Sequence, residues 1–199
     1  MHAKSLAIKT GTVLGHLLAS RAFGARPVTL TGYSLGALVI HTALLHLASL
    51  PPSETTHLIQ DVYLFGIPAP ADEASWTRIR RIVTGRLVNG YSSAETDYVL
   101  AIVCRISMPS AAMGVGIAGL QEVTVAGVEN IYCEGVEGHL KWRGMVGRCM
   151  ERCGVPGVNG DAVEKQVEIV GGRIQKELEM FEKNGYEEDM EIMTRELTR

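Results

Sequence analysis

The chain has 199 residues, of which 46% are hydrophobic and 21% charged, an ordinary composition for one globular domain with a sizeable core. A formal net charge of -3 and a pI near 6.1 give no basic footprint, so we expect no nucleic-acid partner. Four cysteines are too few for a disulfide scaffold at this length, which favours a reducing compartment.

Apolar periodicity predicts alternating helices and strands up to residue 153. The dense apolar content of residues 61–65 is typical of a strand buried on both faces in a parallel sheet. The alternation therefore predicts an α/β fold with a mainly parallel sheet. The predicted elements are helix 4–23, strand 28–31, helix 34–50, strand 61–65, helix 75–84 with Ser75 as its cap, strand 86–91, strand 128–133 and helix 140–153.

Two segments bear on membranes and on domain organisation. The apolar stretch 34–50 contains His41 and His46 and stops at Pro51, so we expect a buried helix and no transmembrane span in this chain. From residue 161 the chain is rich in Glu, Lys and Arg with apolar residues between them. We therefore predict a domain over 1–160 and a charged tail over 161–199, formed by one or two exposed helices or partly disordered.

The segment Gly32-Tyr33-Ser34-Leu35-Gly36 matches Gly-x-Ser-x-Gly between a predicted strand and a predicted helix, the setting of a nucleophile elbow. We expect Ser34 to have a strained backbone and an exposed hydroxyl. The glycines Gly32 and Gly36 are expected because side chains there would collide with the neighbouring strand and helix. The N–H of Leu35, at the positive start of the helix, is expected to face a developing oxyanion. The alternative is an idle serine in a glycine-rich turn.

A serine hydroxyl needs a base, and in this kind of site the partners follow in the order Ser, acid, His. His139 lies downstream of every predicted strand, in a loop before a helix, and is our candidate base. Asp97 follows the strand at 86–91 and is our candidate acid, with Asp72 and Glu95 as alternatives. Asp61 precedes its strand core and would lie at the wrong end of the sheet.

Three further patterns carry weaker functional interpretations. The segment 114–119 reads Gly-x-Gly-x-x-Gly, but it lacks a preceding strand and a following helix, so we expect a loop and no nucleotide cofactor. Arg78, Arg80 and Arg81 are expected to be a solvated helix face rather than a phospholipid contact. Cys149 and Cys153 share a helix face, but no second ligand pair has zinc spacing, so we expect no metal.

Taken together, these motifs resemble the transmembrane and coiled-coil domain lipase-like family, a membrane-associated branch of the α/β-hydrolases with fungal and animal members. The resemblance implies a Ser34, Asp97 and His139 triad, a lipid or acyl ester substrate, an intracellular membrane-associated location and no cofactor. The membrane segments of that family lie upstream of the hydrolase core. The stretches that carry the resemblance are 26–30, 32–36, 59–66, 85–91, 118–121, 128–130 and 138–140.

Only 33 residues precede Ser34, whereas an α/β-hydrolase normally places several strands and an oxyanion loop before its elbow. We therefore expect a partial α/β-hydrolase fold that lacks the N-terminal strands, with the strand at residue 28 as a sheet edge. Loss of one oxyanion donor costs on the order of 100-fold to 1000-fold in rate. The hypothesis is a fragment or truncated form of a serine ester hydrolase. The alternative is a non-catalytic membrane-trafficking or interaction module, and the oligomeric state stays open.

Overall fold

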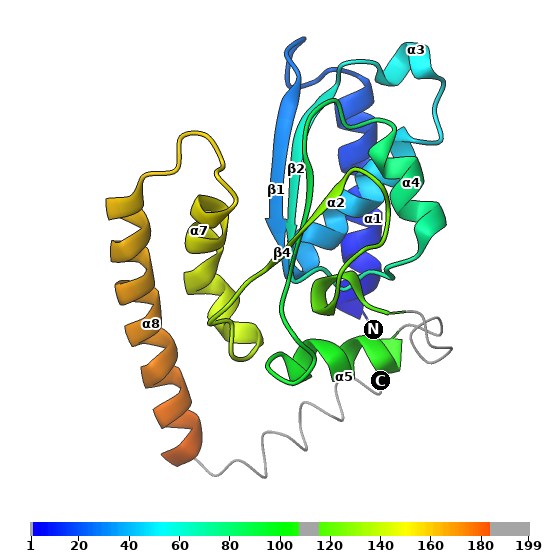
Figure 1. Cartoon of the computed structure of the whole chain (residues 1–199). Helices are drawn as coiled ribbons and strands as arrows, with labels where there is room; N and C mark the ends of the chain where they lie inside the picture. Colours follow the sequence, from blue (N-terminus) through cyan, green and yellow to red (C-terminus); the bar gives the residue numbers. More distant parts are fainter. Residues whose placement is uncertain (1, 108–115, 184–199) are drawn as a thin grey trace. The chain divides into compact units, whose positions relative to one another are not determined.

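A computed structural model describes residues 2–107 and 116–183 of the chain. The chain divides into two compact units, one formed by residues 2–139 and the other by the chain from residue 140 onward (Figure 1). Each unit is described by itself. The division expected after residue 160 stays a prediction.

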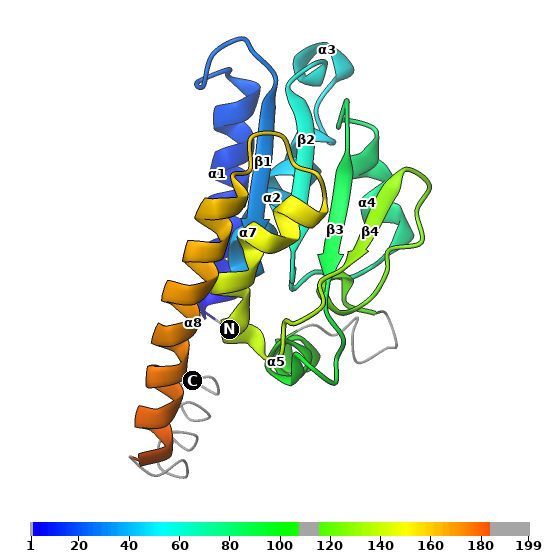
Figure 2. The same ribbon diagram turned by 60° about the vertical axis from the view of Figure 1, so that its left-hand side comes forward.

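The first unit is built on a four-stranded sheet whose strands are all parallel (Figure 2). The strands lie in chain order, so each crossover moves one step in the same direction. This arrangement confirms the predicted α/β class with a parallel sheet. The strands are β1 (Val28–Tyr33), β2 (Ile59–Phe65), β3 (Leu87–Tyr91) and β4 (Val128–Tyr132).

Helices and short turns connect these strands. One predicted detail was wrong: Asp72, not Ser75, caps the helix after β2, and its Oδ1 accepts a hydrogen bond from the Ser75 N–H at 2.8 Å. The helix therefore starts at Glu73, earlier than the predicted residue 75, because the capping residue comes directly before the first helical residue. The helical elements of this unit are α1 (His2–Ala19), α2 (Ser34–Leu47), α3 (Pro52–Thr55), α4 (Glu73–Arg80), α5 (Tyr98–Ser107) and the 3₁₀ turn Ala118–Leu120. A second 3₁₀ turn, His139–Lys141, begins at the last residue of this unit.

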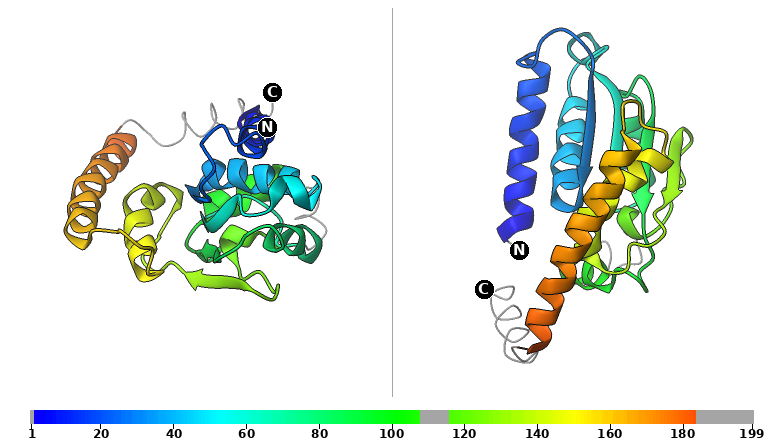
Figure 3. Two further views of the ribbon diagram at one scale, coloured as in Figure 1. Left: turned by 90° about the horizontal axis from the view of Figure 1, so that it is seen from above. Right: turned by 90° about the vertical axis from the view of Figure 1, so that its left-hand side faces the viewer.

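The core lies between the sheet and the helices on one of its faces. Helix α2 packs on β1 and β2 and contacts α4, and α1 packs over the outer side of α2 (Figure 3). The two helices approach closely because Gly11 and Gly15 of α1 face Thr42 and His46, where a Cβ would overlap those side chains. Helix α2 is therefore covered on both sides, as its apolar sequence predicts.

Strand β1 forms one edge of the sheet, as expected, with β2 as its neighbour. Its side chains alternate between half-buried and exposed, which is typical of a strand with one face on the core. In the ranges 2–107 and 116–183, no helix is both long and apolar enough to cross a membrane.

The second unit is an antiparallel helical hairpin of α7 (Trp142–Arg152) and α8 (Gly160–Lys183). Close packing is possible because Gly144 and Gly147 of α7 face Val170 and Val163 of α8. Ion pairs between the described residues of the two helices include Arg148 with Glu164 at 2.8 Å and Arg143 with Glu177 at 3.5 Å. The predicted helical C-terminal region is confirmed up to residue 183, and residues 184–199 lie outside the described part.

Candidate active site

The three side chains predicted to form the site gather at the carboxyl end of the parallel sheet. Ser34 follows the last residue of β1, Asp97 lies in the segment after β3, and His139 lies in the segment after β4. Parallel strands bring the ends of distant segments to one edge, which is where α/β proteins generally place their sites. All three residues belong to the unit formed by residues 2–139.

The turn at Ser34 has the backbone of a nucleophile elbow. Ser34 has a φ of 51°, a left-handed conformation that is uncommon outside glycine and costs on the order of 1–3 kcal/mol. The strand ends at Tyr33 and α2 starts at Ser34 itself, so the chain reverses within one residue. The expected strain at Ser34 is confirmed.

The two elbow glycines differ in their surroundings. A Cβ on Gly32 would lie 2.8 Å from the Ile40 Cδ1 and 2.9 Å from the Ala37 nitrogen, so the expected collision is confirmed there. For Gly36 the expectation was wrong. A Cβ at Gly36 meets no heavy atom within 4 Å among the described residues outside its own turn of helix. Gly36 is exposed in the first turn of α2, so a methyl group there would face open space.

Hydrogen bonds join the three predicted residues in series. Ser34 Oγ lies 2.7 Å from His139 Nε2, and His139 Nδ1 lies 3.0 Å from Asp97 Oδ2. With a proton on Nδ1, the imidazole donates to the carboxylate and its Nε2 accepts from the serine hydroxyl. Asp97 is fully buried, whereas 24% of the His139 side chain is exposed. The candidate base therefore faces solvent and the candidate acid does not.

The segments that hold the acid and the histidine are fastened to each other. The Gly138 N–H donates to the Thr96 carbonyl at 2.7 Å, one residue before each of the two functional side chains. Asp97 is also fixed from its own side, because its Oδ1 accepts the Leu100 N–H at 3.1 Å at the start of α5. Contacts with Leu100 and His139 thus orient the carboxylate. No residue pattern in the sequence indicated these backbone contacts.

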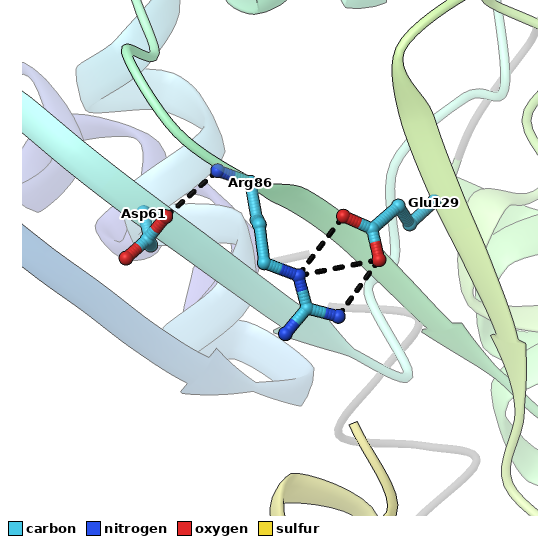
Figure 4. Close-up of polar contacts among 3 residues, drawn as sticks. All are labelled: Asp61, Arg86 and Glu129. Carbon is cyan, nitrogen blue, oxygen red and sulfur yellow. Dashed lines mark hydrogen bonds and ion pairs between the residues drawn. The ribbon is translucent and has the colours of Figure 1, made fainter. Parts of the chain in front are cut away.

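The alternative acids lie elsewhere or have other partners. Asp72 caps α4, as described above, and Glu95 is exposed on the loop before Asp97. Asp61 accepts the Arg86 N–H at 2.7 Å toward the amino end of the sheet, as expected (Figure 4). The Arg86 guanidinium there pairs with Glu129 at 2.7 Å and lowers the pKa of that carboxyl through hydrogen bonding.

Other candidate nucleophiles and ligands do not form a second site. Burial raises the pKa of the Cys104 thiol to about 11, so it stays protonated near neutral pH. Cys149 and Cys153 are buried, and the described residues contain no cluster of His, Cys, Asp or Glu fit for a metal. Arg80 donates to the Val83 carbonyl at 2.7 Å, while its neighbours Arg78 and Arg81 are exposed.

The glycine motif at 114–119 lies partly outside the described residues, since 114 and 115 are not described. Its described end runs into the 3₁₀ turn Ala118–Leu120. Gly119 contacts the chain after β2, with its N–H donating to the Ile67 carbonyl at 3.1 Å. The described end of the motif thus connects the segment before β4 to the segment after β2 through a backbone hydrogen bond.

Comparison with known proteins identifies the family. Residues 2–156 match the model of a family described as protein of unknown function, DUF726. The chain belongs to this family. Relatives of the DUF726 chain include proteins named as membrane proteins, one named as a transmembrane and coiled-coil domain-containing protein and one named as a probable lipase, which confirms the resemblance drawn from its motifs.

Three relatives show how much of a longer protein is matched. An uncharacterized membrane protein of Schizosaccharomyces pombe is 40% identical over 164 residues, which are 81% of this chain and 27% of that protein. The probable lipase MIL1 of Saccharomyces cerevisiae is 37% identical over 155 residues, 77% of this chain and 14% of that protein. The transmembrane and coiled-coil domain-containing protein STS1 of Oryza sativa is 38% identical over 135 residues, 67% of this chain and 19% of that protein. The DUF726 chain thus spans about a quarter or less of these relatives. No solved structure gives a significant match.

Proposed function

We propose that this chain carries the catalytic residues of a lipase-like serine ester hydrolase that acts on a lipid or acyl ester. The observation that supports it best is the series of contacts from Ser34 through His139 to Asp97, at 2.7 Å and 3.0 Å. These residue types, in this order at the carboxyl edge of a parallel sheet, are the arrangement that α/β-hydrolases use for acyl transfer to a serine. The relative named a probable lipase supports the same reaction class.

In the first half-reaction the Ser34 oxygen attacks the ester carbonyl carbon while His139 Nε2 removes the hydroxyl proton. The imidazolium that forms keeps its Nδ1 proton, and the buried Asp97 carboxylate stabilises its charge without taking that proton. The tetrahedral intermediate then collapses as Nε2 returns its proton to the alcohol leaving group. A water molecule, activated by the same imidazole, hydrolyses the acyl-serine and restores the free hydroxyl.

The intermediate also needs a donor for its oxyanion. The N–H of Leu35 is at the first turn of α2, where helical N–H groups have no intrahelical partner and the helix dipole is positive. It is the residue next to the nucleophile, which is the position that supplies one oxyanion donor in an elbow. We assign this role to Leu35.

Labelling with a fluorophosphonate probe tests the proposal, because the probe bonds only to an activated serine. We expect the folded chain to be labelled, Ser34→Ala to abolish the signal, and the matched change of the exposed Ser49 to Ala to leave it intact. His139→Ala should slow labelling by at least about 100-fold, the lower range for a general base. A folded chain that stays unlabelled would instead favour the non-catalytic interaction module.

A further inference from the structure

Helix α5 presents its apolar side to solvent. Five of its side chains are between 36% and 71% exposed, and their spacing places them on one side of the helix. The opposite side is anchored, since Leu100 and Cys104 are buried and pack with Ile117 and Leu120. The exposed residues, which we call the α5 face, are Tyr98, Val99, Ile102, Val103 and Ile106.

The α5 face is attached directly to the candidate acid. Tyr98 follows Asp97 in the chain, and the Asp97 carboxylate that contacts His139 also accepts the Leu100 N–H. The far end of α5 is held by Lys4, whose Nζ donates to the Ser107 carbonyl at 3.2 Å. Figures 1 and 2 show α5 beyond the carboxyl end of the strands, the end at which Ser34 lies.

The charge carried by α5 itself is positive, whereas on the segment before it Glu95 is exposed and Asp97 is buried. Residues 98–107 contain no Asp or Glu, and Arg105 is exposed at the border of the apolar stripe. Lys4 adds a second cationic side chain at the C-terminal end of α5. A helix with apolar residues on one side and basic residues at its edge matches the interfacial layer of an anionic membrane, where the two attractions add.

We propose that the α5 face docks on an anionic lipid surface and brings Ser34 to esters held there. Docking does not depend on the proposed hydrolase function, whereas the delivery of substrate to Ser34 rests on it. A lipid surface fits better than a protein partner, because a protein interface has a polar rim with directional hydrogen bonds. On α5 only Tyr98, Arg105 and Ser107 offer polar side chains of that kind. Exposed patches of this type are uncommon unless something binds them.

The test uses the full 199-residue chain with vesicles of phosphatidylcholine, with and without phosphatidylserine. We expect the parent chain to float with the anionic vesicles, and Ile102→Glu and Ile106→Glu to bind them at least about 10-fold more weakly. Each change removes an apolar side chain that would enter the lipid layer and adds a negative charge, which the anionic headgroups repel. The matched control is Ile169→Glu on α8, where Ile169 is 57% exposed against 54% for Ile102. Circular dichroism checks that every variant is folded.

The outcomes separate docking from catalysis. Ser34→Ala should abolish ester hydrolysis yet bind vesicles like the parent chain. In a catalytically active chain, Ile102→Glu should slow turnover of a vesicle-borne ester about 10-fold more than turnover of a soluble ester. Vesicle binding that Ile102→Glu and Ile106→Glu leave unchanged, or that Ile169→Glu weakens equally, overturns the docking proposal. The docking proposal is also overturned if Ile102→Glu or Ile106→Glu changes the oligomeric state of the chain without changing its binding to vesicles. Binding through α5 without Ser34-dependent hydrolysis overturns the hydrolase function alone.

Discussion

Acidification should destabilise the unit formed by residues 2–139 through His41. This side chain is buried on α2, with its ring centroid 5.5 Å from that of Trp76, and its Nε2 has no hydrogen-bond partner among the described residues. Burial lowers the pKa of His41 from 6.5 to about 4, and the charge of the Asp72 carboxylate opposes this larger effect. The folded state therefore holds the neutral imidazole and resists protonation.

The sign of the effect follows from proton uptake. Below pH 6.5 the unfolded chain binds a proton at His41 that the folded chain does not bind until about pH 4. The stability that His41 contributes is thus complete above 6.5 and is lost as the pH falls toward 4. Between about pH 7 and pH 5 the loss spans roughly 1.5 pKa units, or about 2 kcal/mol.

Urea denaturation at the two pH values, followed by tryptophan fluorescence, measures this loss. The variant His41→Leu fills a similar volume without a titrating group, so its pH-dependent loss should be smaller than the parent's by about 2 kcal/mol. The control is Leu44→Ala, a cavity in the same helix, which should be destabilised equally at both pH values. Equal pH dependence in the parent and in His41→Leu would refute the reasoning.

Three further predictions concern packing and pairing. Gly32→Ala should lower the free energy of unfolding by about 1–3 kcal/mol through overpacking, whereas Gly36→Ala should leave it unchanged or raise it by up to about 1 kcal/mol, as thermal melts will show. Gly119→Ala should cost at least about 1–3 kcal/mol in urea denaturation, because the new Cβ would strike the backbone of residues 66 and 67, which cannot move aside. Arg86→Met should cost less than about 1 kcal/mol in the same assay, and a larger loss would contradict our view that its half-exposed pair with Glu129 is weak.

Local signals in the sequence were enough for the elbow and the sheet. A β-branched run that meets Gly-x-Ser-x-Gly and an apolar helix allows few alternative structures, and every predicted strand is present within two residues of its bounds. The histidine and the acid could be chosen because each follows a predicted strand in the chain order Ser, acid, His, and the segments after parallel strands all start at the carboxyl edge.

Features that depend on the surroundings of a residue could not be predicted in this way. The apolar content of Tyr98–Ser107 gives no indication that its larger apolar side faces outward. The open space beside Gly36 depends on which elements approach the first turn of α2 in the folded chain. The bond from Gly138 to Thr96 joins backbone groups, which every residue has, so no residue type marks it.

The most direct test of the account is a double-mutant cycle on the rate of fluorophosphonate labelling. The rates are measured for the parent chain, Asp97→Asn, His139→Ala and the variant with both changes. If Asp97 acts only by orienting His139 and stabilising its charged form, the double variant should label as slowly as His139→Ala, within about 2-fold. The reason is that the effects of substitutions are non-additive for residues that act as a unit. Losses that multiply in the double variant would show that the two residues act independently and would contradict the account.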